Sequence, residues 1–142
     1  MKKSKILLYL SSLLMLVHLA GHFIGHRTWK TPKDAGMQNV VNAMLGNKAN
    51  YMGAQRSFAD FYHGYSLLLF VIYILSIWIL IVLIGSIRRR DIKLIKNILL
   101  PIGIAYIFFG IIEFLQFFPF AAGLSALAGL LILLSIFFLK KS

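Results

Sequence analysis

Histidine is the residue type of this chain with the clearest capacity for chemistry, and three of its four histidines share one spacing. His18, His22 and His26 recur every four residues, so a helix places them on one stripe. Imidazoles one turn apart can share a metal ion, and a single imidazole can ligate haem iron or exchange a proton near neutral pH. The spacing therefore indicates a binding site along the helix that carries it.

Charged and amide side chains are rare in the apolar parts of the chain, so the few that occur there are informative. Arg56, Asp60 and His63 follow one another at spacings of four and three residues, which predicts a second shared helical face. Glu113 is the one acid within a long apolar run, and Gln116 follows it closely. A carboxylate in such a run has to be paired, hydrated or neutralised by a proton.

Three chemistries fit these residue types. A metal ion bound by His22, His26 and His63, with a carboxylate completing the sphere, is the first. The second is a b-type haem held between one histidine of each of two neighbouring helices. The third is proton transfer on a lipid-like substrate, with a histidine and Glu113 as acid and base. A polar pocket for another ligand, and a purely structural role in bonding helices together, also stay open.

The segments that must position these residues are strongly apolar. Of the 142 residues, 60% are hydrophobic and 13% charged, against about 45–50% and about 25% in soluble domains. A membrane-spanning helix needs about 20 apolar residues, and residues 6–24, 64–87, 98–118 and 120–139 meet this need, the last two divided at Pro119. Because the apolar runs lack the alternation of strands, the sequence predicts an all-α integral membrane four-helix bundle forming one domain over residues 1–142.

Lysine and arginine near the span ends predict the orientation of the chain. With four crossings, ten of the fifteen fall on one side: Lys2, Lys3, Lys5, Arg88, Arg89, Arg90, Lys93, Lys96, Lys140 and Lys141. We therefore expect both termini in the cytoplasm and a multi-pass protein of the inner, cytoplasmic membrane. The basic run at 88–96 lacks interleaved aromatic residues, so membrane lipids are the expected partners and nucleic acid is not.

The segment between the first two spans, residues 26–62, has the pattern of ordered structure. Thr31 and Pro32 predict a helix start, apolar residues between 37 and 45 recur at helical spacing, and Gly46 suits the stop. We expect a short amphipathic helix on the outer membrane surface. A second start signal, from Ser57 to Asp60, opens the helix that becomes the next span.

Small residues predict where helices approach closely. Gly21 and Gly25 form a GxxxG pattern beside the histidine stripe, and Ala122, Ser125, Ala126 and Gly129 give the fourth span a small-residue face. We expect the first span to pack tightly along its histidine side.

The absence of cysteine and of familiar motifs excludes several classes. Without cysteine the chain has no disulfide framework, thiol nucleophile or lipidated cysteine anchor. It also lacks a phosphate-binding loop, a nucleophile elbow and a dinucleotide fingerprint, so the common enzyme classes receive no support. Whether the protein is an enzyme stays open.

Two resemblances rest on particular residues. The pattern Gly21-His22, Arg56 and Asp60-Phe61-Tyr62-x-Gly64 resembles a bacterial family of small four-helix membrane proteins, which implies topology and no activity. The stretch from Glu113 to Phe120 resembles the Glu…Gln…Pro-Phe signature of the EXPERA proteins, which include sterol isomerases and the sigma-2 receptor. That resemblance implies a glutamate lining a lipophilic pocket. The Glu-to-Gln spacing here is three rather than four, and the first span lacks the acids of that group.

These observations predict a binding site at the outer membrane face for a small or lipophilic ligand, a metal ion or haem b. Its expected residues are His18, His22, His26, Arg56, Asp60, His63, Glu113 and Gln116. The alternative is a non-catalytic accessory or structural subunit whose helices pack against a larger membrane complex.

Overall fold

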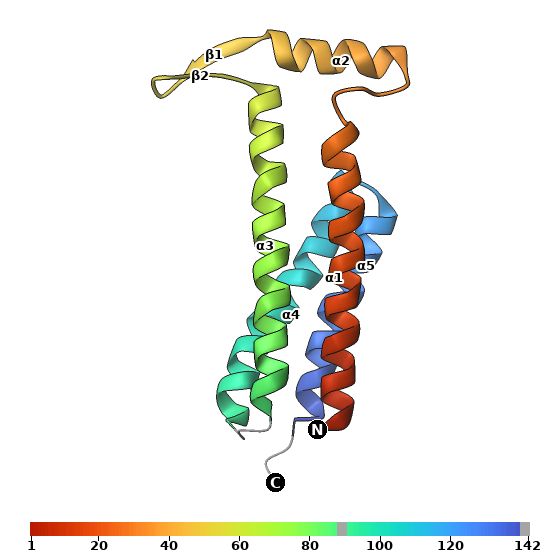
Figure 1. The fold of residues 1–142 in the computed structure, drawn as a ribbon, viewed down its shortest axis with the longest axis vertical. Coiled ribbons are helices and arrows are strands. Elements are labelled where there is room, and N and C mark those ends of the chain that lie inside the picture. Colours follow the sequence, from red (N-terminus) through yellow and green to blue (C-terminus); the bar gives the residue numbers. More distant parts are fainter. Residues whose placement is uncertain (88–90, 140–142) are drawn as a thin grey trace. The chain divides into compact units, whose positions relative to one another are not determined.

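The structure is a computed structural model that describes residues 1–87 and 91–139. Helices account for most of these residues (Figure 1). The helices are α1 (Lys2–Thr28), α2 (Ala35–Gly46), α3 (Phe58–Ser86), α4 (Ile92–Gln116) and α5 (Pro119–Phe137), and the strands are β1 (Lys48–Tyr51) and β2 (Ala54–Ser57). The basic residues 88–90 and Lys140 and Lys141, on which part of the predicted orientation depends, lie outside the described residues.

The four long helices α1, α3, α4 and α5 are each long and apolar enough to cross a membrane. This confirms the prediction of an all-helical, multi-pass architecture. Three of them begin several residues before the predicted spans: α1 begins at Lys2, α3 at Phe58 and α4 at Ile92. Backbone hydrogen bonding and capping set the end of a helix, whereas hydropathy marks only the part of it that suits lipid.

The chain divides into two compact units, one formed by Met1–Leu19 with Tyr73–Ser142 and the other by Ala20–Ile72. In the first unit, parts of all four long helices pack together around buried apolar side chains. Leu8, Leu80, Leu99 and Ile132 are among the side chains with no exposed surface. The Ser11 hydroxyl on α1 donates to the Ala128 carbonyl on α5 at 3.0 Å and joins two helices far apart in sequence.

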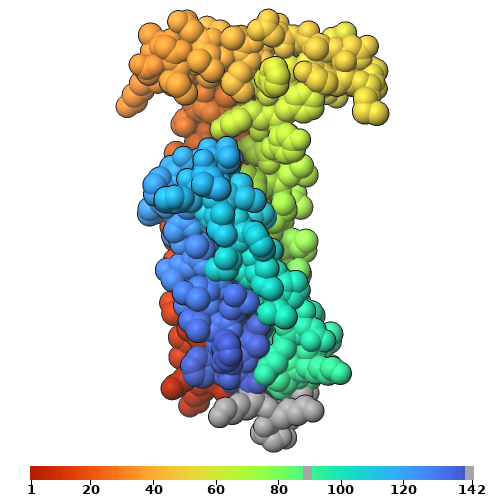
Figure 2. Space-filling view, turned by 180° about the vertical axis from the view of Figure 1, so that it is seen from behind, coloured from red at the N-terminus to blue at the C-terminus, as the bar shows by residue number. Residues whose placement is uncertain are grey.

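Glycine and alanine bring α4 and α5 into direct backbone contact, and Figure 2 shows these two helices side by side. A Cβ added at Gly110 would lie 2.7 Å from the Ala126 Cβ, and one at Gly129 would lie 2.7 Å from the Gly103 carbonyl oxygen. The small-residue face predicted for the fourth span is therefore where it meets the third. The GxxxG prediction for the first span is wrong: an added Cβ at Gly21 or Gly25 would meet no described atom within 4 Å.

Proline separates these two helices as the sequence predicts. The helix α4 ends at Gln116, Phe118 has extended backbone at φ −147° and ψ 147°, and Pro119 begins α5. Proline suits the first position of a helix because that position needs no backbone donor and its φ is already helical. The connection is consequently only two residues long.

The second unit contains α2 and the β-hairpin, which link the end of α1 to the start of α3 (Figure 1). The predicted helix start at Thr31 and Pro32 is wrong by three residues. Asp34 is the N-cap, and its carboxylate accepts a hydrogen bond from the Met37 amide at 2.8 Å. A carboxylate is a favoured acceptor at this position, and the helix ends at Gly46 as expected.

The hairpin of β1 and β2 is absent from the sequence prediction. Its turn places Met52 at φ 52° and Gly53 at φ 91°, and the Asn50 side-chain oxygen accepts from the Gly53 amide at 2.8 Å. Two consecutive positive φ angles are typical of two-residue hairpin turns, in which glycine is favoured. Methionine at the first of these positions hid the signal.

Candidate functional site

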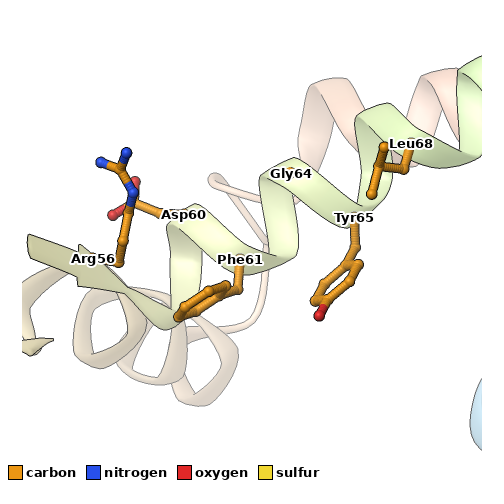
Figure 3. Close-up of a pocket in the computed structure, with 6 residues that line it drawn as sticks. All are labelled: Arg56, Asp60, Phe61, Gly64, Tyr65 and Leu68. Atoms are coloured by element: carbon orange, nitrogen blue, oxygen red, sulfur yellow. The ribbon is translucent and has the colours of Figure 1, made fainter. Parts of the chain in front are cut away.

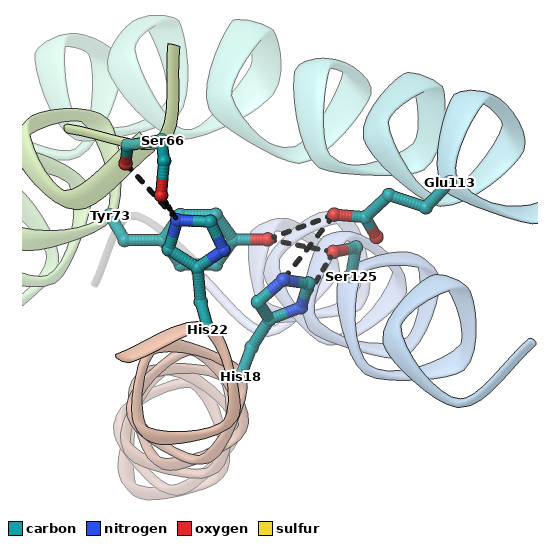
Figure 4. Close-up of polar contacts among 6 residues, drawn as sticks. All are labelled: His18, His22, Ser66, Tyr73, Glu113 and Ser125. Atoms are coloured by element: carbon teal, nitrogen blue, oxygen red, sulfur yellow. Dashed lines mark hydrogen bonds and ion pairs between the residues drawn. The ribbon is translucent and has the colours of Figure 1, made fainter. Parts of the chain in front are cut away.

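Four polar side chains meet inside the first unit, one from each long helix (Figure 4). They are His18 on α1, Tyr73 on α3, Glu113 on α4 and Ser125 on α5, and together we call them the polar ring. His18 is 9% exposed and Glu113 13%, while Tyr73 and Ser125 are buried. A cluster of this polarity within apolar helices is costly to bury unless its members satisfy one another.

The contacts of the polar ring close on themselves. His18 Nε2 lies 3.4 Å from Glu113 Oε1, and the Tyr73 hydroxyl donates to the same oxygen at 3.4 Å. The Tyr73 and Ser125 hydroxyls are 2.9 Å apart, and Ser125 Oγ lies 3.3 Å from His18 Nδ1. The His18 and Tyr73 rings also stack, with centroids 4.6 Å apart.

The hydrogens of the polar ring have one arrangement when Glu113 is a carboxylate. Tyr73 then donates to Glu113, so Ser125 must donate to Tyr73. Ser125 has no second hydrogen, so His18 Nδ1 donates to Ser125, while Nε2 lies 3.4 Å from Glu113 Oε1. When His18 also carries a proton on Nε2, this contact is an ion pair and the ring carries no net charge.

Reversing the three hydrogen bonds that link Glu113, Tyr73, Ser125 and His18 Nδ1 gives a second arrangement, in which the proton lies on the glutamate. Glu113 is then protonated and donates to Tyr73, Tyr73 donates to Ser125, and Ser125 donates to His18 Nδ1. The net charge is again zero, so both arrangements are compatible with burial. The ring can therefore hold one proton on either the histidine or the glutamate.

A second histidine cluster lies within the other unit, where Ser66 on α3 contacts His22 of α1 (Figure 4) and also His26 of the same helix. His22 Nε2 lies 3.1 Å from the Ser66 carbonyl oxygen and 2.9 Å from its hydroxyl, and His26 Nδ1 lies 2.7 Å from that hydroxyl. Since a carbonyl oxygen only accepts, His22 Nε2 donates. The Ser66 hydroxyl accepts from His22 and is then free to donate to His26, which fixes both tautomers.

Aromatic contacts complete this histidine cluster. The rings of His26 and His63 stack at 4.8 Å, and Phe70 packs against His22 at 4.9 Å and His26 at 5.4 Å. His63 Nδ1 is buried, and within residues 1–87 and 91–139 it has no hydrogen-bond partner. The cluster is thus more apolar and less fully bonded than the polar ring.

Arg56 and Asp60 lie apart from these contacts, at the start of α3. The Ser57 amide and hydroxyl donate to Asp60 Oδ2 at 2.8 and 3.1 Å, and the Asp60 amide donates to Ser57 Oγ at 3.2 Å. This reciprocal capping box confirms the predicted helix start. Arg56 and Asp60 also line a shallow groove, described below (Figure 3).

The structure thus distributes the eight predicted site residues over three places. His18 and Glu113 meet in the polar ring, His22, His26 and His63 meet around Ser66, and Arg56 and Asp60 border the groove. Gln116 is exposed at the end of α4 and belongs to none of these groups.

The metal and haem hypotheses gain nothing from this arrangement. Among the residues that the structure describes, no group of three or more His, Asp or Glu side chains is placed to hold a metal ion. A haem between α1 and α3 would need iron between two imidazoles, but His26 and His63 stack face to face at 4.8 Å. His22 Nε2 is already used by Ser66.

Sequence reasoning missed the hydroxyl residues that hold the histidines. Ser66 follows His63 by three residues and Tyr73 follows it by ten, so both lie close to its helical face. Ser125 was assigned to helix packing because its neighbours Ala122 and Gly129 are small. The sequence did contain a signal for these residues. Hydroxyl groups are rare in membrane-spanning helices, and each one there needs a hydrogen-bond partner.

Comparison of the chain with known protein families, with curated proteins and with solved structures gives no match.

Proposed function

We propose that the protein is a membrane-embedded binding protein whose polar ring holds the polar group of a lipophilic molecule. The observation that carries this proposal is the convergence of His18, Tyr73, Glu113 and Ser125, one from each long helix, on a single closed set of contacts. An ion pair in apolar surroundings often contributes no more stability than apolar residues of the same volume. Its presence among helices whose buried side chains are mainly Leu, Ile, Ala and Ser favours a functional role.

The polar ring suits a ligand with one hydroxyl, carbonyl or amine group on an apolar body. Such a group can take over one contact of the ring. Each member of the ring either donates and accepts hydrogen bonds or can gain and lose a proton. Tyr106 and Phe109 pack around Tyr73 at ring distances of 5.5 and 6.4 Å and supply an apolar, aromatic wall. The resemblance of the stretch after Glu113 to the EXPERA signature points in the same direction.

The orientation that goes with this proposal has both termini in the cytoplasm and α2 on the outer face of the cytoplasmic membrane. Lys2, Lys3 and Lys5 precede the apolar part of α1, and Lys93 and Lys96 precede that of α4. The absence of cysteine allows single-cysteine variants without background labelling. We expect a membrane-impermeant maleimide to label Met52→Cys, in the fully exposed hairpin turn, in intact cells and Lys3→Cys only after lysis.

The binding proposal is tested by native mass spectrometry of the protein extracted with its surrounding lipid into bilayer discs. We expect a bound small molecule on the wild-type chain and its loss from Glu113→Gln. The matched control is Ser12→Ala, which removes a buried hydroxyl whose one hydrogen bond among the described residues is to the Leu8 carbonyl of its own helix, at 3.0 Å. A bare wild-type chain, or the same adduct on Glu113→Gln, contradicts the proposal, and a bare chain with other proteins bound favours an accessory subunit.

A further inference from the structure

A shallow groove lies at the start of α3 within the second unit (Figure 3). It has a volume of about 230 Å³ and is lined by Arg56, Asp60, Phe61, Gly64, Tyr65 and Leu68. Gly64 leaves the floor open, since a Cβ there would meet no described atom within 4 Å. Tyr65 is 68% exposed and Leu68 56%. One end of the groove is charged and the other is apolar.

The charged end has a surplus of positive charge. Asp60 is occupied as the cap of α3, because its Oδ2 accepts from both the amide and the hydroxyl of Ser57. Arg56 and Lys48 both lie near enough to act on the Asp60 charge, and β1 pairs Lys48 with Ser57 in the hairpin. Two cations therefore face one carboxylate.

Arg56 keeps its guanidinium available to a ligand. Its one hydrogen bond within residues 1–87 and 91–139 runs from Nη1 to the neighbouring Gln55 carbonyl at 3.5 Å, and no described carboxylate lies within ion-pair distance of it. A guanidinium can donate two parallel hydrogen bonds to a phosphate. Charge complementarity at this end of the groove thus favours an anion with several oxygens.

The position of the groove along α3 places it at the headgroup level if α3 crosses a membrane. No Asp, Glu, Lys or Arg occurs from Phe61 to Ile87, a stretch of roughly 40 Å at the rise of a helix. The hydrocarbon core is only about 30 Å thick, so the first turns of this stretch lie in the interfacial layer. Tyrosine is enriched in that layer because its ring has an apolar body and a polar tip.

We propose that this groove binds the headgroup of an anionic phospholipid. Arg56 pairs with the phosphate, and the glycerol and first acyl carbons lie over Gly64 between the side chains of Tyr65 and Leu68. A phospholipid matches both ends of the groove, whereas a free phosphate leaves the apolar end uncovered. The inference rests on α3 spanning the membrane and is independent of the polar ring, whose residues it does not use.

The test measures lipid binding to the full-length protein by native mass spectrometry after titration with phosphatidylglycerol or with phosphatidylcholine. We expect tighter binding of phosphatidylglycerol, and a loss of about tenfold in its affinity in Arg56→Gln, as for one charge-assisted contact. Gly64→Leu fills the floor of the groove and is expected to give a similar loss. The matched control is Lys33→Gln, which removes the same charge from an exposed residue outside the groove.

Three other outcomes would overturn the proposal that the groove binds an anionic phospholipid. Equal binding of the two lipids removes the role of charge, and an equal loss in Lys33→Gln shows attraction by net charge alone. Arg56-dependent binding of inorganic phosphate that displaces phosphatidylglycerol identifies free phosphate as the ligand. Thermal unfolding of each variant is recorded in parallel, and Gly64→Leu, whose Cβ would meet no described atom within 4 Å, keeps the test valid if Arg56→Gln fails to fold.

Discussion

His18 on α1 and Glu113 on α4 lie in direct contact, with Nε2 and Oε1 3.4 Å apart, inside helices that are apolar enough to cross a membrane. Ser125 and Tyr73 connect the far nitrogen of His18 to the same carboxylate oxygen. The pair is therefore part of a closed ring of four polar side chains. Removing either partner leaves the other buried and poorly solvated.

Replacement of Glu113 by leucine is expected to lower the free energy of unfolding by about 2 kcal/mol, because His18 and Tyr73 lose their shared acceptor. Thermal or denaturant unfolding in detergent measures this. Gln116→Leu is the control on the same helix, since Gln116 is exposed and should change stability little. If the two variants behave alike, Glu113 does not stabilise the helix packing.

Gly110→Ala is expected to destabilise the packing of α4 on α5. The new methyl group would lie 2.7 Å from the Ala126 Cβ and 2.9 Å from its amide nitrogen, so backbone has to move at a cost of about 1–3 kcal/mol. Gly123→Ala on α5 meets no described atom within 4 Å and should be neutral or stabilising by up to about 1 kcal/mol. A melting temperature is measured for both, and equal values would contradict the close approach.

Ser57→Ala removes one half of the capping box at the start of α3. We expect a local loss of about 1 kcal/mol, seen as faster hydrogen exchange of the amides in the first turn. Ser86→Ala, at the other end of the same helix, removes a bond to the Val82 carbonyl of that helix and serves as the control. Unchanged exchange in the first turn of Ser57→Ala would show that Asp60 caps the helix alone.

Ser66→Ala removes the hydroxyl that lies between His22 and His26. We expect the ring nitrogen signals of both histidines to shift in nitrogen-15 spectra, because the hydroxyl fixes both tautomers. The signals of His18, which bonds to Ser125 instead, should stay in place. A change at His18 as large as at His22 would indicate a general loss of structure.

Much of the fold follows from hydropathy and local signals. Unbroken apolar runs predict the four long helices, Pro119 predicts their last division, and Ser57 with Asp60 predicts the start of α3. These features depend on residues close together in sequence. The hairpin was missed because its turn uses Met52, a residue type that seldom adopts positive φ.

The candidate site was predictable only in part, because spacing identifies the residues on one helix and not their partners on another. The stripe of His18, His22 and His26 is real, yet His18 contacts Glu113 while the other two contact Ser66. Small residues likewise do not identify, from sequence alone, which helices pack closely. The GxxxG pattern of α1 has no neighbour within 4 Å of an added Cβ, whereas the glycines of α4 and α5 are in tight contact.

The central claim, that the polar ring binds a ligand through Glu113, has a direct spectroscopic test. Glu113 is the single glutamate of the chain, so glutamate labelled with carbon-13 at Cδ and introduced by cell-free synthesis reports on this one carboxyl group. We predict that its signal moves when co-purified lipid-soluble molecules are extracted from the membrane-reconstituted protein, and returns when they are added back. A signal that is unchanged by extraction, in protein that remains folded, would contradict the account.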